Sequence, residues 1–261
     1  MQIFDDLKRS VVIRGEITKI ISLCPSITET LCDLGLSEKV VGRTKYCIHP
    51  KDDVQNIPIV GDIKNVSLDK IKEINPDIVF ALKQENDKET IEKIAENFPV
   101  FVFDICSVED SQKMIISMGQ ICNIETSATS MFNKIKQKLS NINKLENPLK
   151  YIYFVWKNPY MAAGKETFID SHLSKYGLLN CIENYPQNYA KLDENEFSKL
   201  DPDIIFLPSE PFVFKEKDKF ELQQHFPDKK ILLVEGEMFC WFGSRLVKSI
   251  DYILKIIRVR L

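Results

Sequence analysis

The residues best suited to metal chemistry stand close together in one loop. Cys47 and His49 lie in the segment 43–50, just after a predicted strand, and a thiolate and an imidazole are soft and borderline ligands for transition metals. Two such side chains do not complete a metal site, so a structural role is the simpler interpretation. The other two histidines, His172 and His225, lie in a predicted helix and near a Phe-Pro pair, where structural or solvated roles are the default.

No strong catalytic signature accompanies these residues. The chain has no G-x-G-x-x-G after a strand, no G-x-S-x-G and no H-E-x-x-H. The segment 164–167, Gly-Lys-Glu-Thr, is similar to the end of a phosphate-binding loop. However, Pro159 stands where that loop needs its first glycine, and Glu166 stands where it needs Ser or Thr. We therefore expect a protein that is not an enzyme.

Large aromatic side chains gather at the ends of predicted strands. In a parallel α/β lobe, the loops beyond the carboxyl ends of the strands face the crevice where ligands bind. Core packing is the alternative for any single member of the set. For the whole set we favour a cleft lined with flat apolar surface, suited to a large planar or macrocyclic ligand. The set comprises Tyr46, Trp156, Tyr160, Phe239, Trp241 and Phe242.

A repeated phrase predicts the architecture that must position these residues. The segment 68–81 contains a short helical stretch, a Pro-Asp break and an apolar run, and the segment 195–207 repeats this order. Pro76 and Pro202 stand almost half a chain length apart, which is too far for a solenoid repeat. The repeat therefore predicts two similar α/β lobes, and small molecules usually bind in the cleft between such domains.

Strands and helices alternate in both halves of the chain. Apolar runs at 19–24, 40–42, 78–82 and 100–103 predict the strands of the first half, and runs at 151–156, 203–207 and 230–234 those of the second. Continuous rather than alternating runs indicate parallel strands that are covered on both faces. From 107 to about 147 the pattern is helical, with a break at 123–127, so a stiff helical segment should join the lobes.

Composition sets limits on the partners. The formal net charge of −3 gives no basic surface for nucleic acid, and no apolar run approaches the roughly 20 residues of a membrane helix. The first residues, Met1 to Arg9, lack the pattern of a secretory signal, and the seven cysteines include no C-x-x-C pair. Taken alone, these features favour the cytoplasm.

Several of these motifs together resemble a known family. The segment 20–31, Ile-Ile-Ser-Leu-Cys-Pro-Ser-Ile-Thr-Glu-Thr-Leu, is similar to class III substrate-binding proteins of ABC importers, as are Val41-Gly42, Gly61-Asp62, 75–79 and 158–169. Within that class the chain resembles the types that bind cobalamin, haem or an iron-siderophore. The similarity spans about residues 5–260.

The resemblance implies two Rossmann-like lobes with parallel sheets, joined by a long backbone helix, with the ligand held in the cleft between them. Residues 1–106 would form the N-terminal lobe, 107–148 the helical linker and 149–261 the C-terminal lobe. The family docks one acidic residue of each lobe onto arginines of its membrane permease. Asp69 matches the N-lobe position, whereas Cys240 stands at the C-lobe position, with Glu237 nearby.

The ligand would be a metal chelate (a corrinoid, haem or an iron-siderophore), with no resident cofactor. Tyr46 matches an aromatic residue of the cobalamin proteins, but Ile63, Leu82 and Met238 stand near positions where those proteins have tryptophans. The implied ligand contacts are apolar ones from four aromatic residues, a carboxylate pairing from Arg245, and a metal contact from His49 or Glu237. The four aromatic residues are Tyr46, Trp156, Tyr160 and Trp241.

Two other classes of protein stay open at this point. A cytoplasmic chelatase-like enzyme or metallochaperone would use a histidine–glutamate pair, for which His49 and Glu237 are the candidates. A scaffold that binds a partner protein is the third. The family reading places a monomer in the periplasm or at the outer face of the membrane, whereas the cytoplasm is the alternative.

Overall fold

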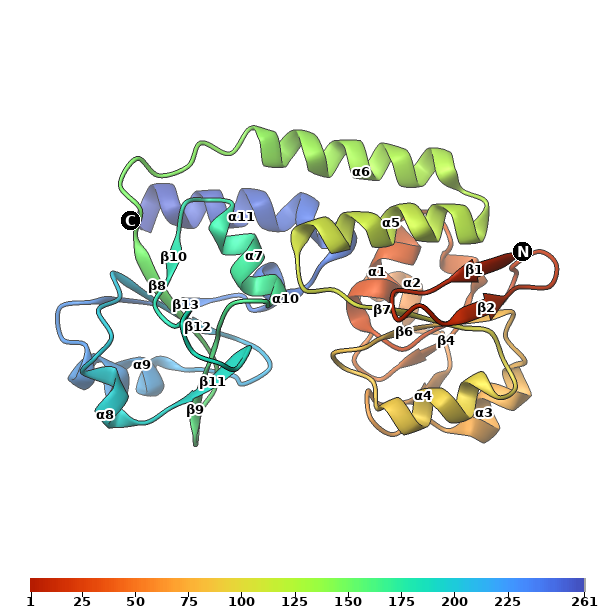
Figure 1. Ribbon diagram of the computed structural model, residues 1–261, viewed down its shortest axis with the longest axis horizontal. Coiled ribbons are helices and arrows are strands. Elements are labelled where there is room, and N and C mark those ends of the chain that lie inside the picture. Colours follow the sequence, from red (N-terminus) through yellow and green to blue (C-terminus); the bar gives the residue numbers. More distant parts are fainter. Residues whose placement is uncertain (261) are drawn as a thin grey trace. The chain divides into compact units, whose positions relative to one another are not determined.

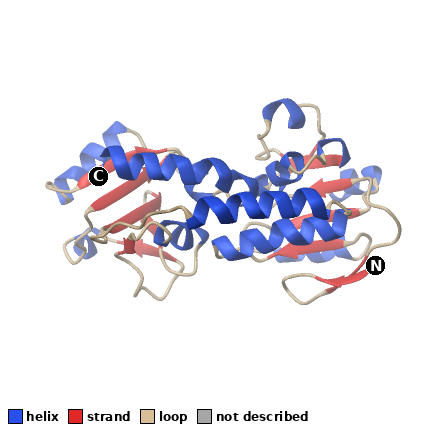
Figure 2. Cartoon of the chain, turned by 90° about the horizontal axis from the view of Figure 1, so that it is seen from above, coloured by secondary structure: helices blue, strands red, loops and turns tan. Residues whose placement is uncertain are grey.

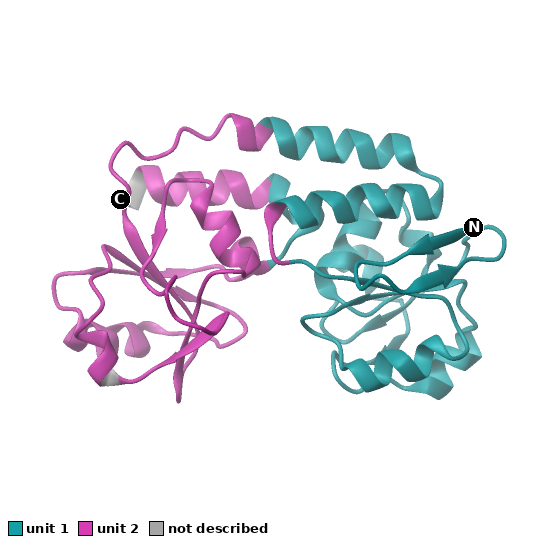
Figure 3. Ribbon diagram, viewed as in Figure 1, with its two compact units in different colours: residues 1–105, 109–137, 241–247 teal, residues 106–108, 138–240, 248–261 magenta. Residues whose placement is uncertain are grey.

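The computed structural model describes residues 1–260, and the side chains of all of these except 194, 259 and 260. The chain forms two compact units (Figure 3). Unit 1 comprises Met1–Ile105, Glu109–Gln137 and Trp241–Val247, and unit 2 comprises Cys106–Val108, Lys138–Cys240 and the described chain from Lys248 onward. Among the described residues, no helix is long and apolar enough to cross a membrane.

Unit 1 is built on a parallel sheet of five strands in the order β5-β4-β3-β6-β7. Figure 1 labels β4, β6 and β7 of this sheet, and Figure 2 draws the strands in red and the helices in blue. From the central strand β3 the chain adds β4 and β5 on one side, and then β6 and β7 on the other. The elements are β1 Gln2–Phe4, β2 Ser10–Val12, β3 Ile20–Ser22, α1 Pro25–Asp33, β4 Val40–Thr44, α2 Lys51–Val54, β5 Ile59–Gly61, α3 Leu68–Ile74, β6 Ile78–Leu82, α4 Lys88–Ala95, β7 Val100–Phe103, α5 Val108–Cys122 and α6 Glu125–Ser140, with a 3-10 turn at Ser37–Lys39.

Unit 2 has a six-stranded sheet in which β11-β9-β8-β12-β13 lie in that order and β10 also pairs with β8. Alternate residues of β8 enter two separate apolar clusters, with Tyr151 and Tyr153 in one and Ile152 and Phe154 in the other. Both faces of this strand are therefore covered. The elements are β8 Lys150–Trp156, β9 Tyr160–Ala163, α7 Phe168–Ser174, β10 Leu179–Asn180, β11 Tyr189–Leu192, α8 Glu194–Phe197, β12 Ile204–Pro208, α9 Glu216–His225, β13 Lys230–Val234, α10 Glu237–Cys240 and α11 Leu246–Arg260, with a 3-10 turn at Gly243–Arg245.

The α/β class is confirmed, with a parallel sheet in unit 1 and a mixed sheet in unit 2. Strand β9 runs antiparallel to both β8 and β11. Only three residues separate β8 from β9, and a parallel pairing needs a crossover of about a dozen residues or more. The sequence reading treated Tyr160–Ala163 as loop and so missed this hairpin.

The helical segment consists of two helices, α5 and α6, with the break where the sequence pattern predicts it. Asn123 adopts a left-handed φ of 56°, which ends α5 inside the break expected at 123–127. Gly119 of α5 then allows a close approach, since a Cβ at this position would lie 2.4 Å from the Cβ of Ala128 on α6. The two helices therefore pack against each other at their junction.

The repeated Pro-Asp phrase performs the same task in each unit. In unit 1 the Asp77 carboxylate accepts hydrogen bonds from the amides of Thr18 (2.7 Å) and Lys19 (2.8 Å), immediately before β3. In unit 2 the Asp203 carboxylate accepts one from the amide of Lys150 (2.7 Å), the first residue of β8. Each aspartate amide also donates to the carbonyl of the same lysine, at 2.9 and 2.8 Å. The repeat thus fixes the start of one central strand against its neighbour.

We predict that Asp77→Ala lowers the free energy of unfolding by about 1–3 kcal/mol, because backbone donors lose their acceptor. Partial burial raises the pKa of Asp77, but the bonds from Thr18 and Lys19 outweigh this and leave the pKa below its usual value. Urea unfolding at neutral pH measures the loss. Asp77→Asn keeps an acceptor oxygen and should cost less; equal stability of the alanine variant and the wild type would contradict the assignment.

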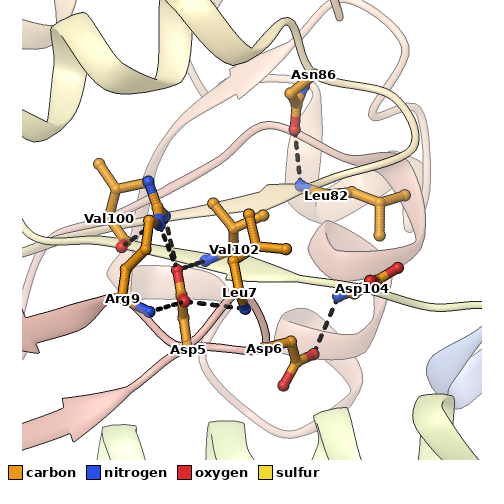
Figure 4. Close-up of polar contacts among 9 residues, drawn as sticks. All are labelled: Asp5, Asp6, Leu7, Arg9, Leu82, Asn86, Val100, Val102 and Asp104. Carbon is orange, nitrogen blue, oxygen red and sulfur yellow. Dashed lines mark hydrogen bonds and ion pairs between the residues drawn. The ribbon is translucent and has the colours of Figure 1, made fainter.

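The N-terminal segment saturates the outer edge of β7 (Figure 4). The Val102 amide donates to the Asp5 carboxylate (3.3 Å), and the Val102 carbonyl accepts from the Asp6 amide (3.2 Å). The Asp104 amide donates to the Asp6 carboxylate (3.0 Å). The Asp5 side chain is buried and forms an ion pair with Arg9 at 2.7 Å, so the guanidinium balances the negative charge of this carboxylate.

One histidine lies in the core of unit 2. His172 of α7 is fully buried, and its Nε2 shares a 3.1 Å hydrogen bond with the Tyr176 hydroxyl. Its ring also packs against Phe168, with 5.6 Å between the ring centroids. Burial lowers the pKa of His172 to about 4, because the charged imidazolium is poorly solvated there.

This histidine should make the fold sensitive to acid. The folded-state pKa lies below the ordinary value near 6.5, so the unfolded chain binds the proton first. Stability is then lost as the pH falls from about 6.5 to about 4, by up to ~3 kcal/mol from this group. We expect His172→Gln to flatten that part of the stability profile, measured by urea unfolding from pH 7 to 4. His225→Gln, at the exposed end of α9, is the control; identical profiles for wild type and His172→Gln would exclude the effect.

Candidate functional site

The carboxyl edge of the unit 1 sheet carries a group of exposed polar and aromatic side chains. Tyr46 lies two residues beyond β4, and 47% of its surface is exposed. The Lys45 ammonium lies 5.0 Å from the centre of the Tyr46 ring and 3.6 Å from the carboxylate of Asp62, which follows β5. The amides of Asn65 and Lys64 donate to Asp62 and hold the pKa of its carboxyl below the usual range. Tyr46 is therefore placed where the strand-end rule predicts a ligand contact.

Cys47 has an environment unsuited to metal binding. It is fully buried, its Sγ lies 3.2 Å from the Thr44 hydroxyl, and burial raises the pKa of the thiol. The thiolate that a metal would need is therefore disfavoured. Within the described residues, no three His, Cys, Asp or Glu side chains form a cluster that could hold a metal ion. The metal role of His49 and Glu237 stays a prediction; they belong to different units, Glu237 lying in the first turn of α10.

Trp241 and Arg245 lie in the segment 241–247, which returns from the end of the chain to unit 1. Trp241 is only 6% exposed, and its ring meets the edge of His49 at 5.4 Å between centroids. The Arg245 guanidinium lies 4.8 Å from the centre of the Trp241 ring. Arg245 Nε donates to the carboxylate of Glu29 on α1 at 2.8 Å, and both side chains are buried. Arg245 is thus paired with a carboxylate of the protein itself, that of Glu29. The pairing of Arg245 with a carboxylate of the ligand stays a prediction.

Backbone hydrogen bonds fix this return segment further. The amides of three successive residues donate to buried hydroxyls of α1 and α5: Phe242 to Ser26, Gly243 to Ser111 and Ser244 to Thr30. Gly243 has a φ of +74°, and a Cβ there would lie 1.9 Å from the Thr30 hydroxyl. This glycine bends the chain into the 3-10 turn Gly243–Arg245, and α11 begins directly after it at Leu246.

We predict that Glu29→Leu destabilises the protein by about 3–5 kcal/mol, because it leaves the buried Arg245 charge without its counter-ion. The double variant Glu29→Leu/Arg245→Met should regain most of that loss, since it removes both charges at similar volume. Chemical unfolding of the two single variants and the double variant gives the coupling energy. Additive single-variant losses would show that the pair does not act as a unit.

Unit 2 presents an aromatic pair at the carboxyl edge of its own sheet. Trp156 ends β8 and is 43% exposed. Phe212 follows the neighbouring strand β12, and the two rings meet edge to face with centroids 5.6 Å apart. Trp156 thus takes the position expected of a ligand-facing residue. The sequence reading missed Phe212, although the strand-end rule applied to β12 would have included it.

The turn after Trp156 is anchored by ion pairs. Lys157 lies 2.7 Å from Asp218 and 2.6 Å from Glu221, both on α9. Burial lowers the pKa of Lys157, but its bonds to the two carboxylates outweigh this and raise it above the usual value. The Tyr160 hydroxyl donates to Glu221 at 3.1 Å while its ring packs into the core. Tyr160 therefore serves the packing of unit 2, and its contact with a ligand stays a prediction.

The two candidate docking positions are also in different units. Asp69 lies exposed in the first turn of α3 in unit 1, as a docking residue requires. Cys240, at the aligned position in unit 2, is half-buried, and its thiol donates to the Glu210 carboxylate at 3.2 Å.

Comparisons with known proteins agree with this architecture. A model of the periplasmic binding protein family matches residues 20–229. The uncharacterized ABC transporter substrate-binding lipoprotein YvrC of Bacillus subtilis is 25% identical over 95% of this chain and 82% of its own length. A vitamin B12-binding protein of Vibrio parahaemolyticus is 19% identical over 73% of this chain and 70% of its own. Among solved structures, the periplasmic haem-binding protein RhuT of Roseiflexus superposes with a TM-score of 0.78 and 19% identity, covering 92% of this chain and 97% of RhuT.

Proposed function

This chain belongs to the periplasmic binding protein family, and from that premise we propose that it binds a metal chelate with a flat apolar face, such as a corrinoid or haem, for an ABC importer. The observation that carries the proposal is the exposed ring of Trp156 at the carboxyl edge of the unit 2 sheet, which meets the half-buried ring of Phe212. Aromatic rings supply large, rigid contact area for a planar ligand. The names of the relatives, vitamin B12-binding and haem-binding, point to the same class of ligand.

Each unit by itself has groups suited to such a ligand. Unit 1 offers Tyr46 with the neighbouring Lys45 ammonium, which suits a ligand that also carries acidic groups. Unit 2 offers Trp156 and Phe212, which suit its apolar face. An iron-siderophore stays within the proposal as a third ligand type. The chelatase-like alternative is not favoured, because the family that matches the chain is one of binding proteins.

The proposed partner is a membrane permease of an ABC importer, with the protein working as a monomer outside the cytoplasm. The Bacillus subtilis relative YvrC is named as a substrate-binding lipoprotein of an ABC transporter. Asp69, exposed on α3, would provide the contact from unit 1.

Titration with aquocobalamin and, separately, with haem tests the proposal through tryptophan fluorescence. We expect saturable quenching at micromolar affinity or tighter by at least one ligand. Trp156→Phe is the reporter control, since it leaves the buried Trp241 as the single tryptophan.

Removing the aromatic pair should weaken that binding. We expect Trp156→Ala and Phe212→Ala each to raise Kd about tenfold, because a ring contact contributes about 1–1.5 kcal/mol. Isothermal titration calorimetry measures the change. Phe220→Ala, which removes a 71% exposed phenyl group from α9, is the matched control and should leave Kd unchanged. Unaltered affinity in both aromatic variants would remove the stacking surface from the proposal.

A further inference from the structure

One buried amide in unit 1 connects three loops at the carboxyl edge of the sheet. Asn86 is 9% exposed, and its Oδ1 accepts a hydrogen bond from the amide of Leu82, the last residue of β6, at 2.8 Å (Figure 4). Its Nδ2 donates to the carbonyl of Leu23, beyond β3, at 3.2 Å. The same Nδ2 donates to the carbonyl of Ile63, beyond β5, at 3.1 Å. The side chain thus bonds to the backbone of three different connections.

This arrangement serves the loops rather than the adjoining helix. Asp87 caps α4, since its carboxylate accepts from the Thr90 amide at 2.9 Å. The Asn86 side chain therefore does not cap α4. Its two amide protons bond to the carbonyls of Leu23 and Ile63, and its oxygen bonds to the amide of Leu82. A buried amide with all three bonds made is expensive to replace, because each lost partner leaves a polar backbone group unsatisfied.

The bonds of Asn86 meet where ligands bind in sheets of this topology. Its partners Leu23 and Leu82 extend from β3 and β6, the adjacent strands between which the chain reverses the direction of strand addition. Open α/β sheets bind ligands outside the carboxyl ends of the strands at this switch point. Asn86 therefore lies directly beneath the edge that the proposed function assigns to the ligand.

From Asn86, a short series of contacts leads to Tyr46. The loop that contains Ile63 is closed by the bond from the Asp62 amide to the Asn65 carbonyl, at 3.0 Å. Asp62 in turn contacts Lys45, whose amide donates to the carbonyl of Gly61 at 2.9 Å. Since Lys45 lies over the Tyr46 ring, the position of that ring depends on the loop that Asn86 holds.

On the β6 side, Asn86 holds the loop that carries two further polar groups. Lys83 and Gln84 follow Leu82, and both donate to the Asp104 carboxylate beyond β7, at 2.5 and 2.6 Å. The loops after β3, β5, β6 and β7 are thus connected in one polar network, and Asn86 makes the bonds between the first three.

We propose that Asn86 is a positioning residue for ligand binding: its amide preorganises the loops after β3, β5 and β6, so that Tyr46 and its neighbours meet the ligand without a cost of loop ordering. This inference rests on the proposed function. Asn86 acts through the loops that it connects and not by touching the ligand.

The test compares the affinity of folded variants for aquocobalamin and for haem. Asn86→Ala removes all three bonds, and Asn86→Ser keeps one polar group in place of two. We expect each to raise Kd about tenfold for the ligand that the wild type binds, measured at a low temperature at which circular dichroism shows the variant to be folded. Hydrogen exchange should show faster exchange of the amides in the segment 61–66.

The matched control is Asn180→Ala in unit 2. Asn180 is also buried, and its amide also connects separate segments, donating to the Ala163 carbonyl at 3.0 Å and accepting from the Ile182 amide at 3.0 Å. It lies beside Tyr151, at the opposite end of β8 from Trp156. Its loss should lower stability as much as Asn86→Ala does and leave Kd unchanged.

The possible results distinguish a failure of the proposed function from a failure of the positioning role of Asn86. A wild-type protein that binds neither ligand contradicts the proposed function itself. A wild type that binds, with both Asn86 variants at wild-type Kd, would falsify the positioning role alone. A parallel rise of Kd in Asn180→Ala and Asn86→Ala would reduce the effect to general stability and also overturn the inference.

Discussion

Unit 1 depends on one buried ion pair that joins its first helix to the last part of the chain. Glu29 and Arg245 stand 216 residues apart in sequence, and neither charge has access to bulk water. Because an unpaired buried charge is so unfavourable, this ion pair stabilises the observed arrangement of the segment 241–247, in which Arg245 also lies against Trp241. The three backbone amides that donate to hydroxyls of α1 and α5 follow from that placement. Unit 1 is thus completed by the segment 241–247, far along the sequence from the rest of the unit.

The features that were predictable from sequence depend on local patterns. The apolar runs and the repeated Pro-Asp phrase are local, and they correctly predicted two α/β units with β3 and β6 in the first and β8 and β12 in the second. The hairpin of β8 and β9 was missed because Tyr160–Ala163 directly follows a proline and ends in two alanines, which have a low strand propensity. The short turn makes β9 antiparallel to β8, but the length of that turn can be counted only when both strands have been recognised.

The same distinction between local and long-range features applies to the residues of the candidate site. Tyr46 and Trp156 were placed correctly at strand ends, since the position of a residue after a strand can be read locally. Trp241 and Tyr160 were grouped with them by type, yet both are buried by partners that no local pattern indicates. His49 meets Trp241 through the same return of the chain. The role of Asn86 was equally invisible, because its partners Leu23 and Ile63 offer only backbone carbonyls, which carry no sequence signal.

The N-terminal segment has a consequence for how the protein behaves at high concentration. The outer edge of a terminal strand normally offers a row of free amides and carbonyls on which another extended chain can grow. On β7 that row is already occupied by Asp5, Asp6 and Arg9, which bond to it without forming a regular strand of their own. An irregular, charged cover cannot itself template a further strand. Sheet growth from copy to copy is therefore blocked on this side of unit 1, and the protein can be abundant without polymerising through β7.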